Sequence, residues 1–142
     1  MYTSPTLGHD DAMRAIEAIR AEVSRAGQAA VIAVSDPHGE LIGLLRMDGS
    51  LISSVQIAIA KAFTAARLRR PSGALSANGF DIAYYGDTRY VGFAGGLPVL
   101  HQGFVVGGIG VSGLSPERED ALAALGIDAI FGAPPAKLDT PE

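Results

Sequence analysis

The stretch that decides the fold is RYVGFAGGLPVLHQGFVVGGIGVSG, residues 89–113, which contains three short apolar runs separated by turns. The turn segments are Gly95-Gly96 and His101-Gln102-Gly103, and glycine is common in the tight turns that join paired strands. Strands joined by such short turns run antiparallel. The pattern therefore predicts three antiparallel strands in this part of the chain.

The segments before this stretch extend the predicted sheet. Residues 29–36, AAVIAVSD, form an apolar run that is too short for a helix, and a Pro-His-Gly turn leads into a second run over residues 40–47. These two runs form a strand hairpin. The sequence therefore predicts a five-stranded antiparallel sheet.

Three further segments have helical features. Apolar residues recur at three or four positions from residue 10 to about 26, where Gly27 ends the helix. A second helix is predicted from residue 51 to about 68, before Pro71, and a third begins after the N-cap residue Ser115 and ends before Gly126. Residues 71–88 are interpreted as a long loop. The predicted fold class is α+β, with the helices laid on the faces of the sheet.

Composition limits the possible functions. The chain has 142 residues, 48% hydrophobic residues, a net charge of −4 and no cysteine. This predicts one domain over residues 1–142 with flexible ends at about 1–9 and 132–142. We expect no nucleic-acid partner because there is no long basic run, and no membrane span because no apolar stretch reaches about 20 residues. The absence of cysteine and of a signal-peptide pattern favours a cytoplasmic location.

The turn Arg46-Met47-Asp48-Gly49 lies between a predicted strand and the second helix. Unpaired N–H groups and the positive end of the helix dipole meet at such a turn, so an anionic ligand can bind there with help from Arg46. The alternative is structural: Asp48 caps the helix and pairs with Arg46. Both interpretations stay open.

Lys61 lies on the same edge of the predicted helix as Ser54, because one helical residue turns by about 100°. Either the lysine stem packs while its ammonium group reaches water, or the ammonium group turns into a cleft, where it holds a carboxylate or shifts its own pKa. An apolar arc on the same helix, which includes Ile52, is expected to face the sheet.

The glycine-rich run Gly107–Gly113, GGIGVSG, lacks the order of a phosphate-binding loop. Ser112 also lacks the sequence context of a nucleophile elbow. Glycine within a strand usually marks the close approach of another backbone or a ligand. We expect the small residues on the Lys61 helix to be the partner of Gly110 and its neighbours.

The chain has three histidines, His9, His38 and His101, each at the end of an element or in a turn. None has the helical spacing of a metal-binding pair, so we predict no protein metal site. One histidine is still sufficient as an axial ligand of haem, which needs only one or two protein ligands.

The sequence resembles the GlcG/HbpS-like haem-degrading family, which also includes the C-terminal domain of PduO-type proteins. The motifs that carry the resemblance are Arg46-Met47-Asp48-Gly49, Lys61-Ala62, Thr64-Ala65 and Gly110-Val111-Ser112-Gly113. The resemblance covers most of residues 10–131. It implies a three-layer α/β/α fold of the profilin-like kind, assembly into homo-oligomers, and for some members the binding of haem or a corrinoid.

The sequence departs from the family pattern after Gly113, where family members usually have another glycine and then Gln-Asp. Here Leu114 follows directly, and the family aspartate corresponds to Asp120. The segment GFDIAYYGDTRYVGF, residues 79–93, contributes Tyr84, Tyr85 and Arg89. These can hold a planar aromatic acid or a porphyrin edge, or they are ordinary loop packing.

We hypothesise a cytoplasmic protein that binds a small ligand, either haem or another planar anion, in a cleft formed by the Arg46–Gly49 turn, Lys61 and the Gly110–Gly113 strand. The predicted ligand-binding residues are Arg46, Met47, Gly49, Ser54, Tyr84, Tyr85, Arg89, Gly110, Ser112 and Gly113. The alternative is a small enzyme that acts on an acidic substrate with Lys61 and Asp48 as acid–base groups. A third hypothesis is a structural accessory that makes only oligomer contacts.

Overall fold

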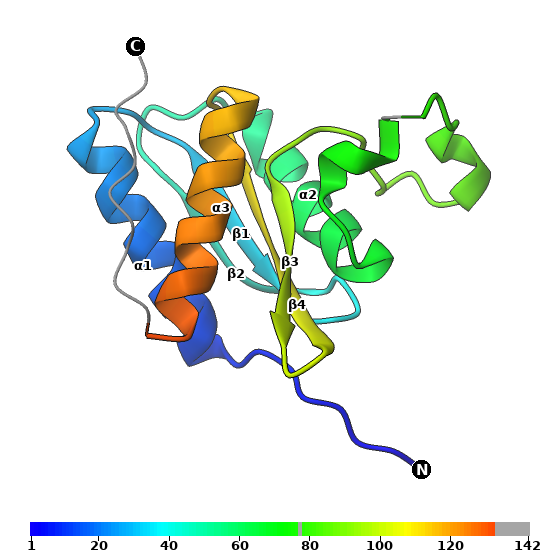
Figure 1. Cartoon of the computed structure of the whole chain (residues 1–142). Coiled ribbons are helices and arrows are strands. Elements are labelled where there is room, and N and C mark those ends of the chain that lie inside the picture. Colours follow the sequence, from blue (N-terminus) through cyan, green and yellow to red (C-terminus); the bar gives the residue numbers. More distant parts are fainter. Residues whose placement is uncertain (77, 133–142) are drawn as a thin grey trace.

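The computed structural model describes residues 1–76 and 78–132 and contains a four-stranded antiparallel sheet between helices (Figure 1). The strands lie in the order β2-β1-β4-β3, and each neighbouring pair is antiparallel. Their bounds are β1 Val31–Ser35, β2 Leu41–Arg46, β3 Gly96–His101 and β4 Phe104–Ser112. The α+β class is confirmed, whereas the predicted fifth strand is wrong.

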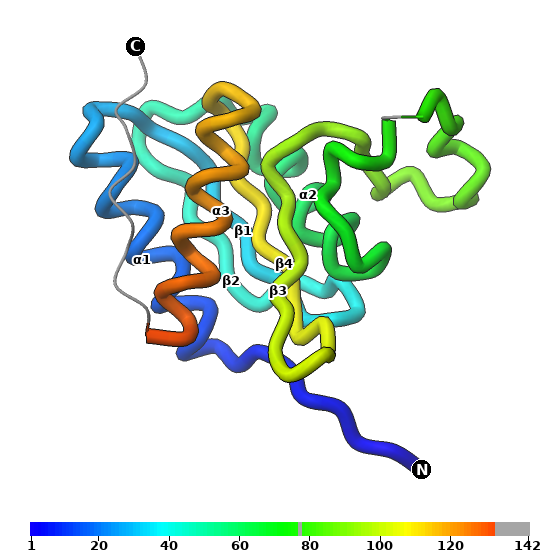
Figure 2. Tube along the Cα trace, in the orientation of Figure 1, coloured from blue at the N-terminus to red at the C-terminus, as the bar shows by residue number. Residues whose placement is uncertain are grey.

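Helices cover both faces of the sheet, which gives the predicted three layers; the profilin-like type stays a prediction. The helices are α1 His9–Arg25, α2 Ser54–Leu68 and α3 Pro116–Ile130. Helices α1 and α3 pack side by side on one face, and α2 lies on the other (Figures 1 and 2). Two short 3-10 helices, η1 Ser72–Ser76 and η2 Ile82–Tyr85, lie in the loop after α2.

The central strand β1 is buried on both faces. Ile32 and Val34 belong to the core beneath α1 and α3, whereas Val31 and Ala33 pack against α2. This alternation follows because successive side chains of a strand point to opposite faces. A run of apolar residues such as AAVIAVSD is therefore required at this position.

The predicted strand over residues 89–94 is absent because side chains satisfy its backbone groups. The Val91 N–H donates to Thr64 Oγ1 on α2 (3.0 Å), and the carbonyls of Gly92 and Phe93 accept from Ser76 Oγ (3.0 Å) and Ser72 Oγ (2.5 Å) of η1. No neighbouring strand is needed to pair these groups. The segment instead crosses the surface beside α2.

Two predicted helix bounds are also wrong. Helix α3 continues to Ile130 because Gly126 is a packing residue: a Cβ atom there would lie 2.7 Å from Ile19 Cδ1 of α1. Helix α2 begins at Ser54 instead of residue 51. Consequently Ile52, which we expected to face the sheet, lies before the helix and is 71% exposed.

The contact between β4 and α2 depends on glycine. A Cβ atom at Gly110 would lie 2.7 Å from the Ala62 nitrogen and still closer to the carbonyl oxygen of Ala58. Gly108 has a similar position against Ala62 and Ala66. The predicted pairing of the glycine strand with the small residues of the Lys61 helix is therefore confirmed.

Of the two ends that we predicted to be flexible, the structure describes residues 1–9 and only Gly132 of the other. Leu7, inside the segment expected to be flexible, is buried, and its N–H donates to the Val106 carbonyl (2.9 Å). The other predicted flexible end falls on residues 133–142, outside the described residues, apart from Gly132. No helix in the described ranges is both long and apolar enough to span a membrane.

Candidate functional site

The predicted site residues do not share one cleft, and those that line a hollow are divided among three. Ser54, Lys61, Ser112 and Gly113 line a hollow of about 590 Å³, which we call the Lys61 hollow. Arg46, Met47 and Asp48 line a second hollow of about 440 Å³, together with residues of and after α1. Arg89 lines a third, of about 370 Å³, which we call the Arg89 hollow.

A buried ion pair forms the wall of the Lys61 hollow. Lys61 Nζ lies 3.0 Å from Glu119 Oε1 and donates to the Val111 carbonyl (2.9 Å), and the two side chains are 3% and 6% exposed. Glu119 Oε2 accepts from the N–H groups of Gly113 (2.9 Å) and Leu114 (3.3 Å). One carboxylate therefore joins α2, α3 and the end of β4.

This geometry decides between the two interpretations of Lys61. Its ammonium group turns inward and holds a carboxylate, which Glu119 of the same chain provides. We did not predict Glu119 as a site residue, although its spacing along α3 indicates a buried position. It lies three and seven residues before Leu122 and Gly126, which places it on the buried face of α3.

Gly95 lets the backbone close over this pair. A Cβ atom at Gly95 would lie 2.9 Å from Lys61 Nζ and 3.0 Å from Glu119 Cβ. The Gly95 N–H donates to Asp120 Oδ1 (2.8 Å), so α3 also holds this loop. Gly110, by contrast, lies in the contact between β4 and α2, outside the hollows described above.

The Arg46 turn does not have the predicted cap. The N-cap residue of α2 is Ser53, and no ion pair joins Arg46 to Asp48 in the described ranges. Gly49 has a φ of +85°, which suits the turn that ends this segment. Because Asp48 and Lys61 line different hollows, the structure does not bring the predicted acid–base pair together.

The Arg89 hollow has an apolar wall and a charged rim. Its apolar lining includes Leu41, Ile57, Ile59, Ala60, Phe63 and Val91. The guanidinium carbons of Arg67 and Arg89 lie 4.4 and 4.3 Å from the centroid of the Phe63 ring. Such cation–π contacts hold both cations beside an aromatic surface.

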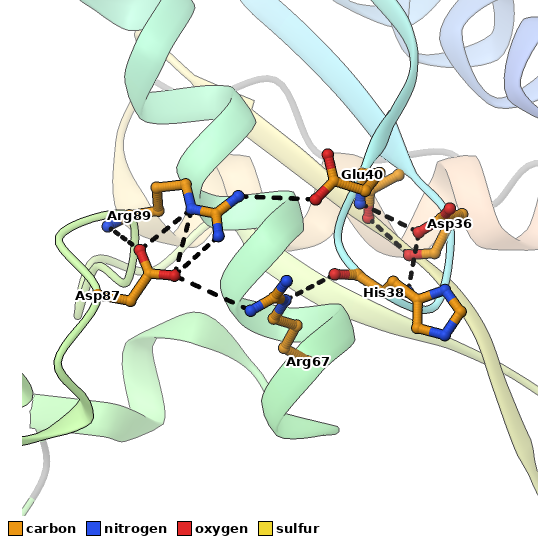
Figure 3. Close-up of polar contacts among 7 residues, drawn as sticks. Asp36, His38, Glu40, Arg67, Asp87 and Arg89 are labelled. Atoms are coloured by element: carbon orange, nitrogen blue, oxygen red, sulfur yellow. Dashed lines mark hydrogen bonds and ion pairs between the residues drawn. The ribbon is translucent and has the colours of Figure 1, made fainter.

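Carboxylates hold these two arginines in place, as Figure 3 shows. Arg89 Nη2 lies 2.8 Å and Arg67 Nη1 lies 3.9 Å from Asp87 Oδ2, and Arg89 Nη1 lies 3.6 Å from Glu40 Oε1. Arg67 Nε also donates to the His38 carbonyl (2.6 Å). The loop after η2 is thereby connected to α2 and to the β1–β2 turn.

The two predicted tyrosines lie beside this hollow but do not line it. Tyr85 contacts Tyr90 (ring centroids 5.0 Å apart), and Tyr90 contacts Phe63 at the same distance. Tyr84 packs against Phe80 and is largely exposed. These rings form a continuous aromatic row that leads to the hollow.

The three histidines lie on different parts of the fold and do not group as metal ligands. His9 is exposed beside Asp10, His101 stacks on Phe131, and His38 is exposed on the β1–β2 turn. The described residues contain no group of three metal-binding side chains. Among these histidines, His38 is the one that adjoins a residue lining the Arg89 hollow, Gly39.

Acid should weaken the Arg89 cluster through Asp87. The side-chain hydrogen bond from Arg89, followed by the bond from its backbone N–H, lowers the pKa of Asp87 from 3.8 to about 2. A lowered pKa contributes stability that is complete above the unfolded value and is lost as pH falls through the folded value. Between pH 4 and 2, we therefore expect wild type to lose unfolding free energy more steeply than Asp87→Asn.

Urea unfolding of both proteins across this pH range measures the difference. The Asp87 side chain is 25% exposed and its partner Arg89 is 52% exposed, so water screens the pair and the expected difference is small. Parallel pH profiles for the two proteins would contradict the role of this carboxylate.

A family model described as "Haem degrading protein HbpS-like" matches residues 7–128. A 15.0 kDa protein encoded between dhaT and dhaS in Citrobacter freundii is 31% identical over 123 residues, which cover 82% of this chain and 87% of that protein. The corrinoid adenosyltransferase PduO of Salmonella typhimurium is 32% identical over 124 residues, which cover 78% of this chain but only 36% of PduO.

A solved structure named as a complex of PduOC with haem has the same fold. It superposes with a TM-score of 0.80 at 26% identity and covers 87% of this chain and 94% of that one. The similarity thus extends over nearly all of the elements described above.

Proposed function

Because the chain belongs to the HbpS-like family of haem-degrading proteins, we propose that it binds haem or another planar anionic molecule in the Arg89 hollow. The observation that carries the proposal is the pair of guanidinium groups on Phe63 at the rim of an apolar hollow. The haem complex of the similar PduOC supports the choice of ligand.

The residues of the Arg89 hollow fit the organic part of haem. Leu41, Ile57 and Ile59 offer apolar contacts to a flat ring, and the volume lies in the range of about 300–1,000 Å³ that is typical of ligand pockets. Arg89 lines the hollow, and its Nη1, which lies 3.6 Å from Glu40 Oε1, is the group proposed to donate to a carboxylate of the ligand. Arg67 adds positive charge on the Phe63 ring.

An iron ligand would have to come from the rim. The residues that line the hollow include no histidine, methionine or tyrosine. His38 is on the turn that also contributes Gly39 and Glu40, although its ring points away from Arg67 and Arg89 (Figure 3). A bound haem would supply iron-based redox and oxygen chemistry. This chain would contribute the apolar wall and the cations, and His38, on the turn beside the hollow, would be the residue to hold the iron.

The proposal predicts that Arg89→Ala weakens haem binding by about tenfold or more. A hydrogen bond to a charged group contributes about 1.5–3 kcal/mol, and each 1.4 kcal/mol is a factor of ten in affinity. Titration of the protein with haem, followed by the Soret band, gives the dissociation constant. Glu40→Gln should have the opposite effect, because it removes a negative charge from the lining of the hollow.

Arg46→Ala is the matched control, because it makes the same change in a different hollow. It should leave the haem affinity unchanged. A Soret band identical to that of free haem, or equal losses in Arg89→Ala and Arg46→Ala, would remove the proposal.

Homo-oligomer assembly and a cytoplasmic location stay predictions. Sedimentation velocity of the purified chain tests the first. A monomer at the concentrations used for the haem titration would contradict it.

A further inference from the structure

Serine hydroxyls without a protein partner line the Lys61 hollow. Ser54 and Ser112 are only 3% and 4% exposed, and neither hydroxyl forms a hydrogen bond with any described residue. Ser53, the N-cap residue of α2, also makes no side-chain cap bond. Neither the Ser54 nor the Ser112 oxygen is among the fully buried side-chain atoms without a partner in the described residues, so both hydroxyls open onto the hollow, where water or a ligand supplies the partner.

The Lys61 ammonium group also has an unused donor. It carries three protons, and two of them point to Val111 O and Glu119 Oε1. The third has no acceptor among the described residues. Lys61 is one of the residues that line the hollow, which places this donor at the wall of the hollow.

These polar groups meet at Gly113. Its N–H donates to Glu119 Oε2, and Glu119 Oε1 in turn accepts from Lys61. On the other side, a Cβ atom at Gly113 would lie 3.4 Å from Ser54 Oγ. Lys61 and Ser54 also share one edge of α2, and helical side chains lean toward the N-terminus, which brings the ammonium group toward Ser54.

The charges favour an uncharged acceptor. Lys61 and Glu119 cancel each other, so the hollow offers directed donors without net charge. A carboxylate placed there would lie near Glu119 and would lose its hydration, which is costly for an ion that gains no unpaired counter-charge. A carbonyl oxygen loses less on leaving water and needs only hydrogen-bond donors.

The entrance of the hollow is apolar. Leu51 and Phe93 line it and are 67% and 60% exposed, although both are large apolar side chains. Leu114 and Pro116 extend the same surface. A concave apolar surface with a few convergent polar groups is the usual form of a small-molecule site.

We propose that the Lys61 hollow binds a small molecule through an uncharged carbonyl oxygen. The oxygen accepts hydrogen bonds from Lys61 Nζ and Ser54 Oγ, while the apolar body of the molecule covers Leu51 and Phe93. This site is distinct from the proposed haem site and shares only Ile57 with it.

The test is a titration of the full chain with benzamide and with benzoate, which have the same shape but differ in charge, followed by ¹H–¹⁵N NMR. We expect benzamide to move the amide signals of Gly95, Gly113 and Leu114, and to bind at least threefold more tightly than benzoate at these residues. Signals that move only at Thr88 and Val91 would place the probe in the Arg89 hollow and would overturn the proposal.

Ser54→Ala is the test variant, because Lys61 variants leave Glu119 unpaired and endanger the fold. It should weaken benzamide binding at least threefold, whereas Arg89→Ala should not change it. Equal affinity of wild type and Ser54→Ala, or tighter binding of benzoate at Gly113, would refute the proposal. The haem titration is independent of these results, so the two proposals can fail separately.

Discussion

Gly110→Ala is expected to destabilise the chain by about 3 kcal/mol or more, a large share of the roughly 5–15 kcal/mol that holds a native domain together. The added Cβ atom would overlap the Ala58 carbonyl oxygen and would lie 2.7 Å from the Ala62 nitrogen. Both neighbours are backbone atoms of α2, so no side chain can rotate away. Relief requires α2 to move off the sheet, which opens the contact with Val31 and Ala33.

Urea unfolding followed by circular dichroism measures this loss. Gly8→Ala is the matched control, because its Cβ atom would meet its nearest neighbour, Asp11 Oδ2, at an ordinary 3.7 Å. Gly8 is the N-cap residue of α1, and its replacement should cost no more than about 1 kcal/mol. Equal stability of Gly110→Ala and Gly8→Ala would show that β4 and α2 are not in the close contact described here.

The sequence predicts this contact well because it depends on local composition. Glycines in a strand and alanines on one helix edge both indicate close backbone approach, and the two patterns match. The third segment of the predicted sheet fails for a non-local reason. Residues 89–94 form a short, strand-like run, but Thr64, Ser72 and Ser76 bond three of their backbone groups. No pattern within residues 89–94 shows that these serines and this threonine lie opposite.

The candidate sites also depend on contacts between distant segments, which local sequence patterns do not show. Lys61 and Ser54 are placed together by helical spacing, and the structure puts both in one hollow. Glu119 is 58 residues from Lys61 along the chain, so their pairing depends on how α3 packs. Likewise, Arg46 and Lys61 are predicted to frame one cleft, but they line different hollows.

Glu119→Gln is expected to cost about 3–5 kcal/mol of unfolding free energy, because removal of one partner leaves the other charge buried and unpaired. Lys61 is then 3% exposed with no carboxylate beside it. Lys61→Met should cost a similar amount, since Glu119 loses its cation but stays beneath the Gly113 backbone. Urea unfolding of each variant, compared with wild type at neutral pH, gives these values.

The double variant Lys61→Met with Glu119→Gln should cost clearly less than the sum of the two single variants, because it buries no unpaired charge. A coupling of at least about 1 kcal/mol is expected for groups in direct contact. The control is Glu17→Gln, which breaks the exposed pair with Arg20 on α1 and should change the unfolding free energy little, because solvent screens exposed ion pairs. If Glu119→Gln costs no more than Glu17→Gln, the Lys61–Glu119 pair is not buried in solution. The hollow without net charge that is proposed for a carbonyl ligand would then lose its basis as well, since it depends on the same two charges cancelling each other.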